Sequence, residues 1–196
     1  MDNQLFFRSS LSAVDSDSRT IEGVAVVFNK WSQDLGGFIE RVIPTAISQE
    51  LIAQSDVIAN YEHNSPDYMM ARSRNGKGTL QLELKEDGLY FRFEAPTTSK
   101  GDELLYHVRN GNITECSFCF ALAPDSNSER WYKNKEGKLC RDICKIGGLY
   151  DISLVQVAAY PDTYCHTRSV EKAKEVDDII VKDLEERLSD VLKYEI

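Results

Sequence analysis

The feature that most constrains the fold is a pair of alternating segments on either side of a short polar turn. Apolar and polar residues alternate along Thr79–Leu84 and along Leu89–Ala95, and Lys85-Glu86-Asp87-Gly88 separates the two runs. A period of two is that of a β-strand with one buried face, and two such runs around a glycine-containing turn predict a hairpin. We expect Gly88 to take the left-handed position of this turn. The core must therefore rest at least partly on antiparallel strands.

Several other segments have strand character, and they outnumber the expected helices. Leu5–Val14 and Thr20–Phe28 are rich in β-branched and aromatic residues and predict a second hairpin. Segment 29–42 is expected to be irregular, and the polar, turn-rich segment 124–137 is expected to be a mobile loop or the tip of a long hairpin. Further strands are expected at Asp56–Tyr61, around Ser117, at Cys140–Ile146 and at Leu149–Ala158. The predicted fold class is mainly β with flanking helices (α+β), as a barrel or a sandwich.

Three segments predict helices. Pro44–Ala53 has helical composition, and an approximate capping box that begins at Ser99 predicts a helix that stops at Gly111. Segment 169–196 contains no glycine or proline, and apolar residues recur in it every three or four positions, at Val176, Ile180, Leu184 and Leu188. That spacing predicts an amphipathic helix. We therefore expect one domain at residues 1–168 and a helical tail at 169–196.

The charge and hydropathy of the chain argue against two classes of partner. A net charge of −9 over 196 residues, with no basic cluster, argues against nucleic acid, because binding it requires cations that displace counterions from phosphates. No run of about 18 apolar residues is present, and the start lacks a basic region followed by an apolar one, so we expect no membrane segment and no export signal. The expected location is the cytoplasm.

The cysteines suggest thiols rather than disulfides. Five cysteines, an odd number, indicate a reduced protein. Cys116 and Cys119 form a Cys-x-x-Cys and Cys140 and Cys144 a Cys-x-x-x-Cys, spacings that can indicate zinc. Residues three apart on a strand point to opposite faces, however, and no histidine lies near either pair in sequence. We expect thiols packed in or near the core, with no metal and no cofactor; a thiol or zinc protein built around Cys116 and Cys119 is the weaker alternative.

Ser117 places a hydroxyl inside an apolar strand. Alternation puts Ser117 and Cys119 on one face and the larger Phe118 and Phe120 on the other, so we expect bulky side chains to be buried opposite the serine. A serine becomes a nucleophile when a base takes its proton and a third group orients that base. Ser117 is therefore a candidate nucleophile, provided that the rest of the chain supplies both groups.

The chain has three histidines that could act as the base. His107 lies in an expected helix and is most simply a surface or packing residue, and His166 lies in a polar connector. His63 stands at the end of an expected strand and is the best placed of the three. Asp151 is a carboxylate in an apolar strand, where it needs a partner. That partner is a backbone amide, a lysine, an arginine, or the imidazole of His63.

Four segments of the chain follow one another in a specific order. They are Ile21-Glu22-Gly23-Val24-Ala25-Val26-Val27-Phe28-Asn29 continued by Asp34 to Pro44, His63 to Leu80, Gly101 to Phe120, and Leu149 to Thr163. In order and approximate spacing they closely resemble the prohead (capsid maturation) serine proteases of tailed bacteriophages, which are related to the herpesvirus assemblin proteases. The chain departs from the family pattern at Ala71-Arg72-Ser73, where Gly-Arg-Thr is usual, and at Thr45-Ala46-Ile47, where Gly-Ala-Phe is usual.

The resemblance implies roles for individual residues. Ser117 matches the nucleophile, and His63 matches the general base that later protonates the leaving amine. Asp151 stands where the phage motif has its acidic residue and is implied as the third member; assemblins use a second histidine instead, and His166 is the alternative. The implied fold is an assemblin-like closed β-barrel surrounded by helices. Arg72 and Arg74 either hold a substrate carbonyl or are solvated, and the oxyanion hole is unassigned.

The resemblance also implies an activity and partners. The chain is expected to be a serine endopeptidase that cleaves scaffold, or the scaffolding segment of the major capsid protein, and then itself. It would act in the host bacterial cytoplasm, inside the assembling prohead. The tail at 169–196 either docks on scaffold, capsid protein or a second copy of the chain, or packs on its own domain. The alternative function is that of a catalytically weak assembly protein that has a protease fold and binds capsid protein.

Overall fold

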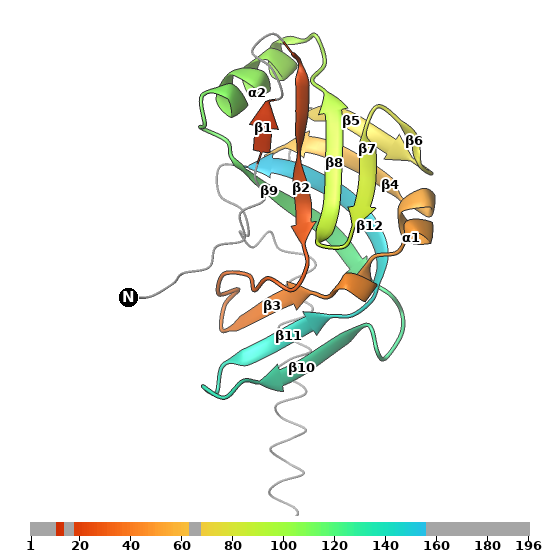
Figure 1. Cartoon of the computed structure of the whole chain (residues 1–196), viewed down its shortest axis with the longest axis vertical. Helices are drawn as coiled ribbons and strands as arrows, with labels where there is room; N and C mark the ends of the chain where they lie inside the picture. Colours follow the sequence, from red (N-terminus) through yellow and green to blue (C-terminus); the bar gives the residue numbers. More distant parts are fainter. Residues whose placement is uncertain (1–10, 14–17, 63–67, 156–196) are drawn as a thin grey trace, which may run out of the picture. The chain divides into compact units, whose positions relative to one another are not determined.

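The computed structural model describes residues 11–13, 18–62 and 68–155, and most of them lie in strands (Figure 1). The helices are η1 (Pro44–Ala46), α1 (Gln49–Gln54) and α2 (Ser99–Arg109). The strands are β1 (Leu11–Ala13), β2 (Thr20–Val27), β3 (Phe38–Val42), β4 (Asp56–Tyr61), β5 (Met69–Arg74), β6 (Lys77–Gly78), β7 (Gln81–Lys85), β8 (Gly88–Glu94), β9 (Glu115–Leu122), β10 (Glu129–Lys133), β11 (Leu139–Ile143) and β12 (Ile146–Val155). The predicted mainly β class with few helices is confirmed.

The strands form three sheets. Their orders are β1-β2-β8-β7, β6-β5-β4-β12-β9 and β10-β11-β3. Within the described ranges no ladder joins these sheets into a closed barrel, so the barrel stays a prediction. The predicted boundary at residue 168 and the predicted helix at 169–196 lie outside the described residues.

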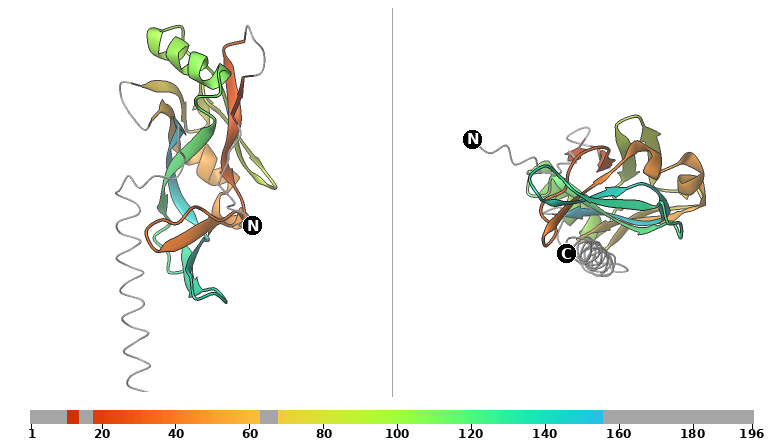
Figure 2. Two further views of the ribbon diagram at one scale, coloured as in Figure 1. Left: turned by 90° about the vertical axis from the view of Figure 1, so that its left-hand side faces the viewer. Right: turned by 90° about the horizontal axis from the view of Figure 1, so that it is seen from below.

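One hydrophobic core lies between the four-stranded and the five-stranded sheet. Figures 1 and 2 show β2, β8 and β7 on one side and β4, β12 and β9 on the other, with the strands of one sheet running across those of the other. Val26 and Phe91 contribute from the first sheet and Val57, Leu149 and Ile152 from the second, all at most 3% exposed. Burial of each such side chain stabilises the fold by about 1.5–3 kcal/mol. The five-stranded sheet therefore has one face fixed on the core and one face turned away from it.

The hairpin predicted around residues 85–88 is confirmed, but the role expected of Gly88 is wrong. β7 and β8 pair antiparallel from Gln81 opposite Arg92 to Lys85 opposite Gly88. Gly88 is not among the residues with positive φ; instead a Cβ on it would lie 2.2 Å from the carbonyl oxygen of Val26. The glycine is needed because β2 and β8 approach closely there.

Two segments for which no strand was predicted do contain strands. β3 lies within segment 29–42 and β10 within segment 124–137, and both pair with β11, β3 in parallel and β10 antiparallel. The apolar–polar alternation of β3 and β10 is interrupted by charged residues, which the fold buries as ion pairs. Arg141 Nη1 lies 2.8 Å from Glu40 Oε2 and Arg141 Nε lies 2.8 Å from Glu129 Oε2, with both acids and Arg141 almost fully enclosed.

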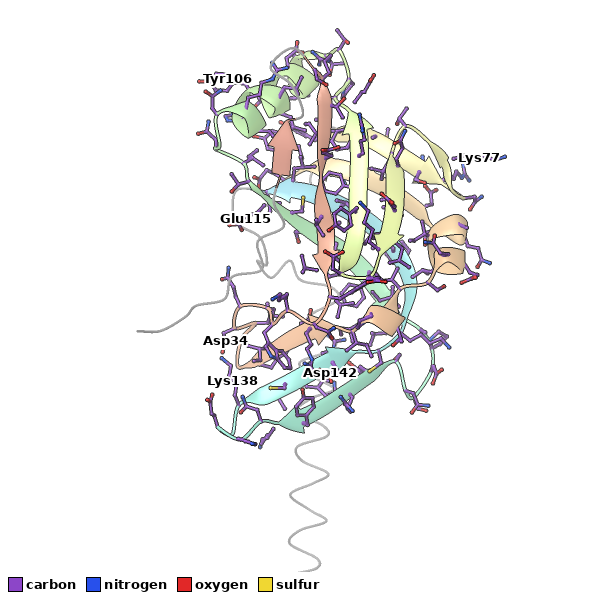
Figure 3. The ribbon with its side chains drawn as sticks, viewed as in Figure 1. Asp34, Lys77, Tyr106, Glu115, Lys138 and Asp142 are labelled. Atoms are coloured by element: carbon purple, nitrogen blue, oxygen red, sulfur yellow. The ribbon has the colours of Figure 1, made fainter. Side chains whose placement is uncertain are left out.

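The opposite face of the same small sheet carries a second ion network, centred on Asp142 of β11 (Figure 3). Arg41 Nε donates to Asp142 Oδ1 over 2.7 Å, and Arg130 Nη2 donates to Oδ2. The Asp142 side chain is fully buried while Arg41 and Arg130 are partly exposed. Burial opposes ionisation of Asp142, but the hydrogen bonds from the two arginines outweigh it and hold the pKa of this carboxyl below its usual value.

The helices follow the sequence with two local differences. The segment predicted as one helix at Pro44–Ala53 is divided into η1 and α1, because Ser48 caps a new helix by accepting from Leu51 N. The cap of α2 is Thr98 rather than Ser99; its hydroxyl accepts a hydrogen bond from Gly101 N over 3.2 Å. Gly111, with φ of +69°, follows the end of the helix as expected.

Candidate active site

Ser117 lies in β9, on the face of the five-stranded sheet that is turned away from the core. Cys116 and Phe120 are buried in the core and Phe118 packs against it, whereas Ser117 is half-buried. The expected separation of bulky side chains from the serine is confirmed. The hydroxyl therefore stands on the outer face of a strand whose inner face is anchored.

Asp151 shares this outer face because β12 contains one extra residue. Leu149 pairs with Phe120 and Asp151 pairs with Cys119, so Tyr150 forms a bulge. Simple alternation would place Asp151 on the same face as Leu149, which is in the core. A one-residue bulge reverses the facing of every residue that follows it, and the carboxylate thereby reaches the face of Ser117.

Both carboxylate oxygens of Asp151 accept hydrogen bonds from buried neutral side chains. Ser153 Oγ donates to Asp151 Oδ1 over 2.7 Å, and Asn60 Nδ2 donates to Oδ2 in a short contact. Asn60 lies beside Ser153 in the parallel β4–β12 ladder. Asn60 is 2% exposed and Ser153 0%, whereas Asp151 is half-buried. The carboxylate is thus oriented by two side chains that are closed off from solvent.

The β9–β12 ladder also sets the spacing between Ser117 and Asp151. Ser117 is the direct cross-strand partner of Ser153, and Asp151 is the partner of Cys119, so Ser117 and Asp151 are diagonal neighbours on one face. Diagonal neighbours are separated by roughly 7–8 Å. Residues at this spacing are close enough for one further side chain to contact both.

His63 and His166 lie outside the described residues, and their predicted roles stay predictions. The last described residue before His63 is Glu62, whose N–H donates to Leu154 O over 3.0 Å. Leu154 pairs with Cys116, the neighbour of Ser117. Glu62 has φ of +55°, a left-handed conformation that ends the alternation of β4. The period of two that holds for Val57, Ala59 and Tyr61 therefore ends at Glu62.

His107 is the histidine that the described ranges include. It lies in α2, half-buried, with its ring centroid 5.4 Å from that of Tyr106 and 6.3 Å from that of Tyr61. Its Nδ1 lies 3.2 Å from Asn112 Nδ2. Tyr61 belongs to the core face of β4, opposite to the face of Asn60. His107 thus has the packing role expected for it.

Arg72 and Arg74 have a structural partner on β4. Arg72 Nε donates to Asp56 Oδ1 over 2.7 Å, and Arg74 Nε lies 3.5 Å from Asp56 Oδ2. Asp56 begins β4, and Asn60 lies near its other end. The two arginines therefore neutralise a carboxylate away from the outer-face residues that surround Asp151.

The four cysteines of the described ranges do not form a metal-binding cluster. Cys116 is buried and Cys119 half-buried, on opposite faces of β9, and none of the four cysteines in the described ranges is in a disulfide. Burial raises the pKa of Cys140 and of Cys144, which disfavours the thiolate at both. Among the residues that the structure describes, no group of three or more histidine, cysteine or acidic side chains is arranged to hold a metal ion.

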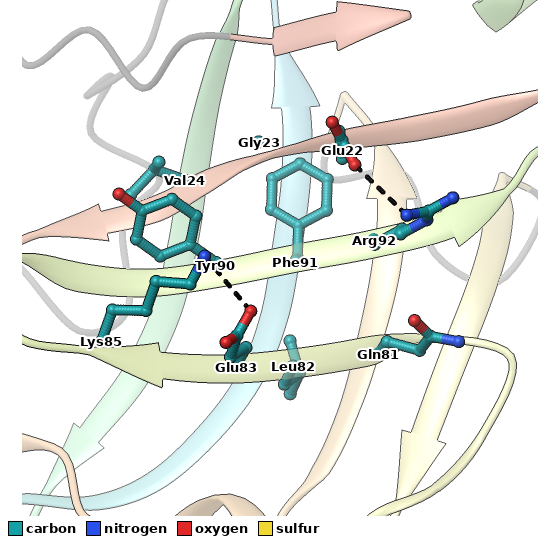
Figure 4. Close-up of a pocket in the computed structure, with 10 residues that line it drawn as sticks. All are labelled: Glu22, Gly23, Val24, Gln81, Leu82, Glu83, Lys85, Tyr90, Phe91 and Arg92. Carbon is teal, nitrogen blue, oxygen red and sulfur yellow. Dashed lines mark ion pairs between the residues drawn. The ribbon is translucent and has the colours of Figure 1, made fainter. Parts of the chain in front are cut away.

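A hollow of about 680 Å³ lies on the outer face of the four-stranded sheet (Figure 4). Two ion pairs cross its lining, Glu22 with Arg92 at 3.8 Å and Lys85 with Glu83 at 3.3 Å. Its walls contain no serine, cysteine or histidine. This hollow lacks the groups that nucleophilic chemistry requires, in contrast to the outer face around Ser117.

Sequence reasoning missed Asn60 and Ser153. Both had a readable signal: Ser153 stands two residues after Asp151 on the same strand, and Asn60 alternates with the apolar Val57, Ala59 and Tyr61. The bulge at Tyr150 had no signal in the sequence, because an extra residue in β12 can be recognised only when β12 is paired with β9.

A half-buried serine hydroxyl and an oriented carboxylate on one face of a mainly β domain are parts of the apparatus of a serine hydrolase. The family model described as caudovirus prohead serine protease matches residues 8–176 of the chain. The chain belongs to this family, and it is a serine protease of phage capsid maturation. Searches of curated proteins and of solved structures each found no match.

Family membership bears on partners as well. It implies a polypeptide substrate in the capsid and action in the assembling prohead. In the part of the chain that the structure describes, no helix is both long and apolar enough to cross a membrane.

Proposed function

We propose that this chain is a serine endopeptidase in which Ser117 is the nucleophile, His63 the general base and Asp151 the residue that orients His63. The observation that carries the proposal is the shared outer face of β9 and β12. Ser117 and Asp151 are diagonal neighbours there, and the carboxylate is already oriented by hydrogen bonds. This arrangement puts both side chains within reach of one imidazole.

Two facts support His63 as that imidazole. It is covalently next to Glu62, whose N–H is bound to Leu154, and Leu154 pairs with the neighbour of Ser117. His107, by contrast, packs on the core side of the sheet end. His166 remains the alternative third member, in which case Asp151 would have a structural role only.

The proposed reaction proceeds in two halves. Ser117 Oγ attacks the scissile carbonyl carbon as His63 takes the hydroxyl proton, and the imidazolium then gives this proton to the amine as the C–N bond breaks. Water attacks the resulting acyl-enzyme in the same way, with His63 taking its proton, and the imidazolium returns a proton to Ser117 Oγ as the ester bond breaks. Asp151 stays ionised and stabilises the imidazolium in both halves.

The proposed substrates are scaffold, or the scaffolding segment of the major capsid protein, followed by the protease itself, inside the prohead in the bacterial host. Membership in the prohead protease family supports a substrate of this class. We further propose the assemblin-like barrel and a docking role for the tail at 169–196. The barrel proposal is supported by the core shared between two sheets and by contacts between β2 and β9.

The test is co-expression of the chain with the major capsid protein from the same genome. We expect the parent to shorten the capsid protein and itself, and Ser117→Ala and His63→Ala to leave both at full length. Ser73→Ala is the matched control, because Ser73 is a buried serine of the same sheet and is outside the proposed machinery. Normal processing by Ser117→Ala would refute the nucleophile. A parent that binds capsid protein without cutting it would instead support the alternative of a catalytically weak assembly protein.

A further inference from the structure

Two side chains that take no part in the proposed reaction bind the carboxylate of Asp151. Asn60 and Ser153 come from two adjacent strands and each binds one carboxylate oxygen. Neither is accessible to a peptide, since both are buried. Burying an amide and a hydroxyl costs free energy that an apolar pair of similar size would avoid. Their contacts with Asp151 account for why polar groups stand there.

Asn60 makes this argument sharper. Its amide donates through Nδ2 to Asp151, while its Oδ1 is buried and, within the described residues, has no hydrogen-bond partner. The side chain thus leaves one polar atom unsatisfied and uses the other on the carboxylate. A residue present only to fill space at this position would be apolar.

We infer that Asn60 and Ser153 are positioning residues that fix the orientation of the Asp151 carboxylate toward the base. The inference rests on the proposed function, because it assumes that Asp151 orients the base that activates Ser117. An ionised carboxylate has several acceptor directions, and a donor on each oxygen leaves the remaining lone pairs aimed in defined directions. Without those donors the carboxylate can rotate, and the imidazole loses its fixed tautomer and orientation.

Asn60→Asp is the most informative variant, because its effect depends on protonation. When the new carboxyl is protonated, its O–H can donate to Asp151 Oδ2 as the amide does. When it is ionised, it repels Asp151 and donates nothing, and two adjacent carboxylates raise the pKa of one of them. The ratio of variant to parent activity is therefore expected to fall as the pH rises.

The experiment measures labelling of the purified full-length chain by a fluorophosphonate probe. Ser117 Oγ bonds to phosphorus, fluoride leaves, and the serine proton passes to the base, so the rate reports activation of the serine without any peptide substrate. Rates are taken from about pH 5.5 to about pH 8.5, across the range in which a carboxyl beside another carboxylate titrates. Mass spectrometry identifies the labelled residue.

We expect Ser153→Ala and Asn60→Ala to slow labelling by roughly tenfold to a hundredfold at all pH values, the effect of one hydrogen bond to a charged group. Asn60→Asp should approach the parent rate at low pH and fall below Asn60→Ala at high pH. Ser73→Ala should label like the parent. Thermal melting at the same pH values separates slow labelling from unfolding.

The outcomes distinguish the two layers of the proposal. A parent that is not labelled at Ser117 refutes the proposed nucleophile. A parent that is labelled at Ser117, with folded Asn60 and Ser153 variants that label at the parent rate, refutes the positioning role and leaves the proposed function standing. A constant ratio of Asn60→Asp to parent across the pH range also refutes it, since repulsion and donation would then play no part.

Discussion

Ser117 and Ser153 are direct cross-strand partners on the outer face of β9 and β12, and only one of them can meet a peptide. Ser117 is half-buried, whereas Ser153 is fully buried and its hydroxyl donates a hydrogen bond to Asp151. Direct partners have Cβ atoms about 4.5–5.5 Å apart, so two hydroxyls of like chemistry stand close together with different tasks. Ser153 is thus committed to the carboxylate, whereas Ser117 is the one proposed to act on substrate.

Replacing Asp151 tests which residue is the third catalytic member. We expect Asp151→Asn to reduce cleavage of the capsid protein by about a thousandfold or more, because an amide at this position can stabilise the wrong imidazole tautomer. His166→Ala should then retain cleavage. Asp56→Asn is the matched control, since Asp56 lies on the neighbouring strand and pairs with Arg72. Loss of cleavage in His166→Ala with retention in Asp151→Asn would reverse the assignment.

Deleting Tyr150 tests the bulge. Removal of this residue would return Asp151 to the core face or shift the rest of β12, so we expect cleavage to be lost and the free energy of unfolding to fall by several kcal/mol, on the order of 3. Tyr150→Ala keeps the number of residues and changes a side chain that is 52% exposed. It should retain cleavage and most of the stability in chemical denaturation. A deletion variant with parental cleavage would show that the bulge does not place Asp151.

Asp142 is expected to matter for stability rather than for cleavage. Asp142→Asn leaves Arg41 and Arg130 close together without their shared carboxylate, and it should lower the free energy of unfolding by about 2–3 kcal/mol. Urea denaturation at neutral pH measures this. Tyr132→Phe is the matched control, because it removes a 3.3 Å hydrogen bond to the same carboxylate and a 3.4 Å hydrogen bond from Arg41 Nη2 but leaves every charge in place. Equal effects of the two substitutions would contradict a network centred on charge.

The same network predicts a dependence on pH. The folded-state pKa of Asp142 is depressed, so its contribution is present above the unfolded value of about 3.9 and is lost as the pH falls through the folded value. We expect the parent to lose stability between about pH 5 and about pH 2 more steeply than Asp142→Asn does. Parallel acid-unfolding curves of the two proteins would contradict this.

Gly88→Ala tests the close approach of β2 and β8. The added Cβ would meet the carbonyl oxygen of Val26 at 2.2 Å, so the ladder must open, and we expect a loss of about 2 kcal/mol in the free energy of unfolding. Glu86→Ala, in the exposed turn of the same hairpin, should change stability by less than about 0.5 kcal/mol. Equal stability of the two variants would show that a Cβ at position 88 fits between β2 and β8, contrary to the prediction.

Prediction from sequence worked where one strand face is apolar. The hairpin of β7 and β8, strand β4 and the two faces of β9 follow from alternation, because burial of one face enforces a period of two. It did not find β3 and β10. Glu40 and Glu129 interrupt their apolar patterns, and these acids are buried only because Arg141 of a strand distant in sequence pairs with both.

For the candidate site, too, some features could be predicted from sequence and others could not. Ser117 and Asp151 could be named from the chain alone, by an out-of-place hydroxyl and an out-of-place carboxylate and by family resemblance. Their common face could not be, since it depends on a bulge that exists only in the ladder between β9 and β12. Asn60 and Ser153 were overlooked because their signal, a polar residue within a strand, indicates a role only once its partner Asp151 is known.

The left-handed backbone at Glu62 has a consequence for how such a site can change over time. The proposed nucleophile and acid lie on two paired strands of one sheet, so the register of β9 against β12 fixes their separation. The proposed base, His63, follows Glu62 directly in the sequence. A substitution at Glu62 that disfavours this backbone would therefore redirect the chain that leads to the base while leaving Ser117 and Asp151 in register.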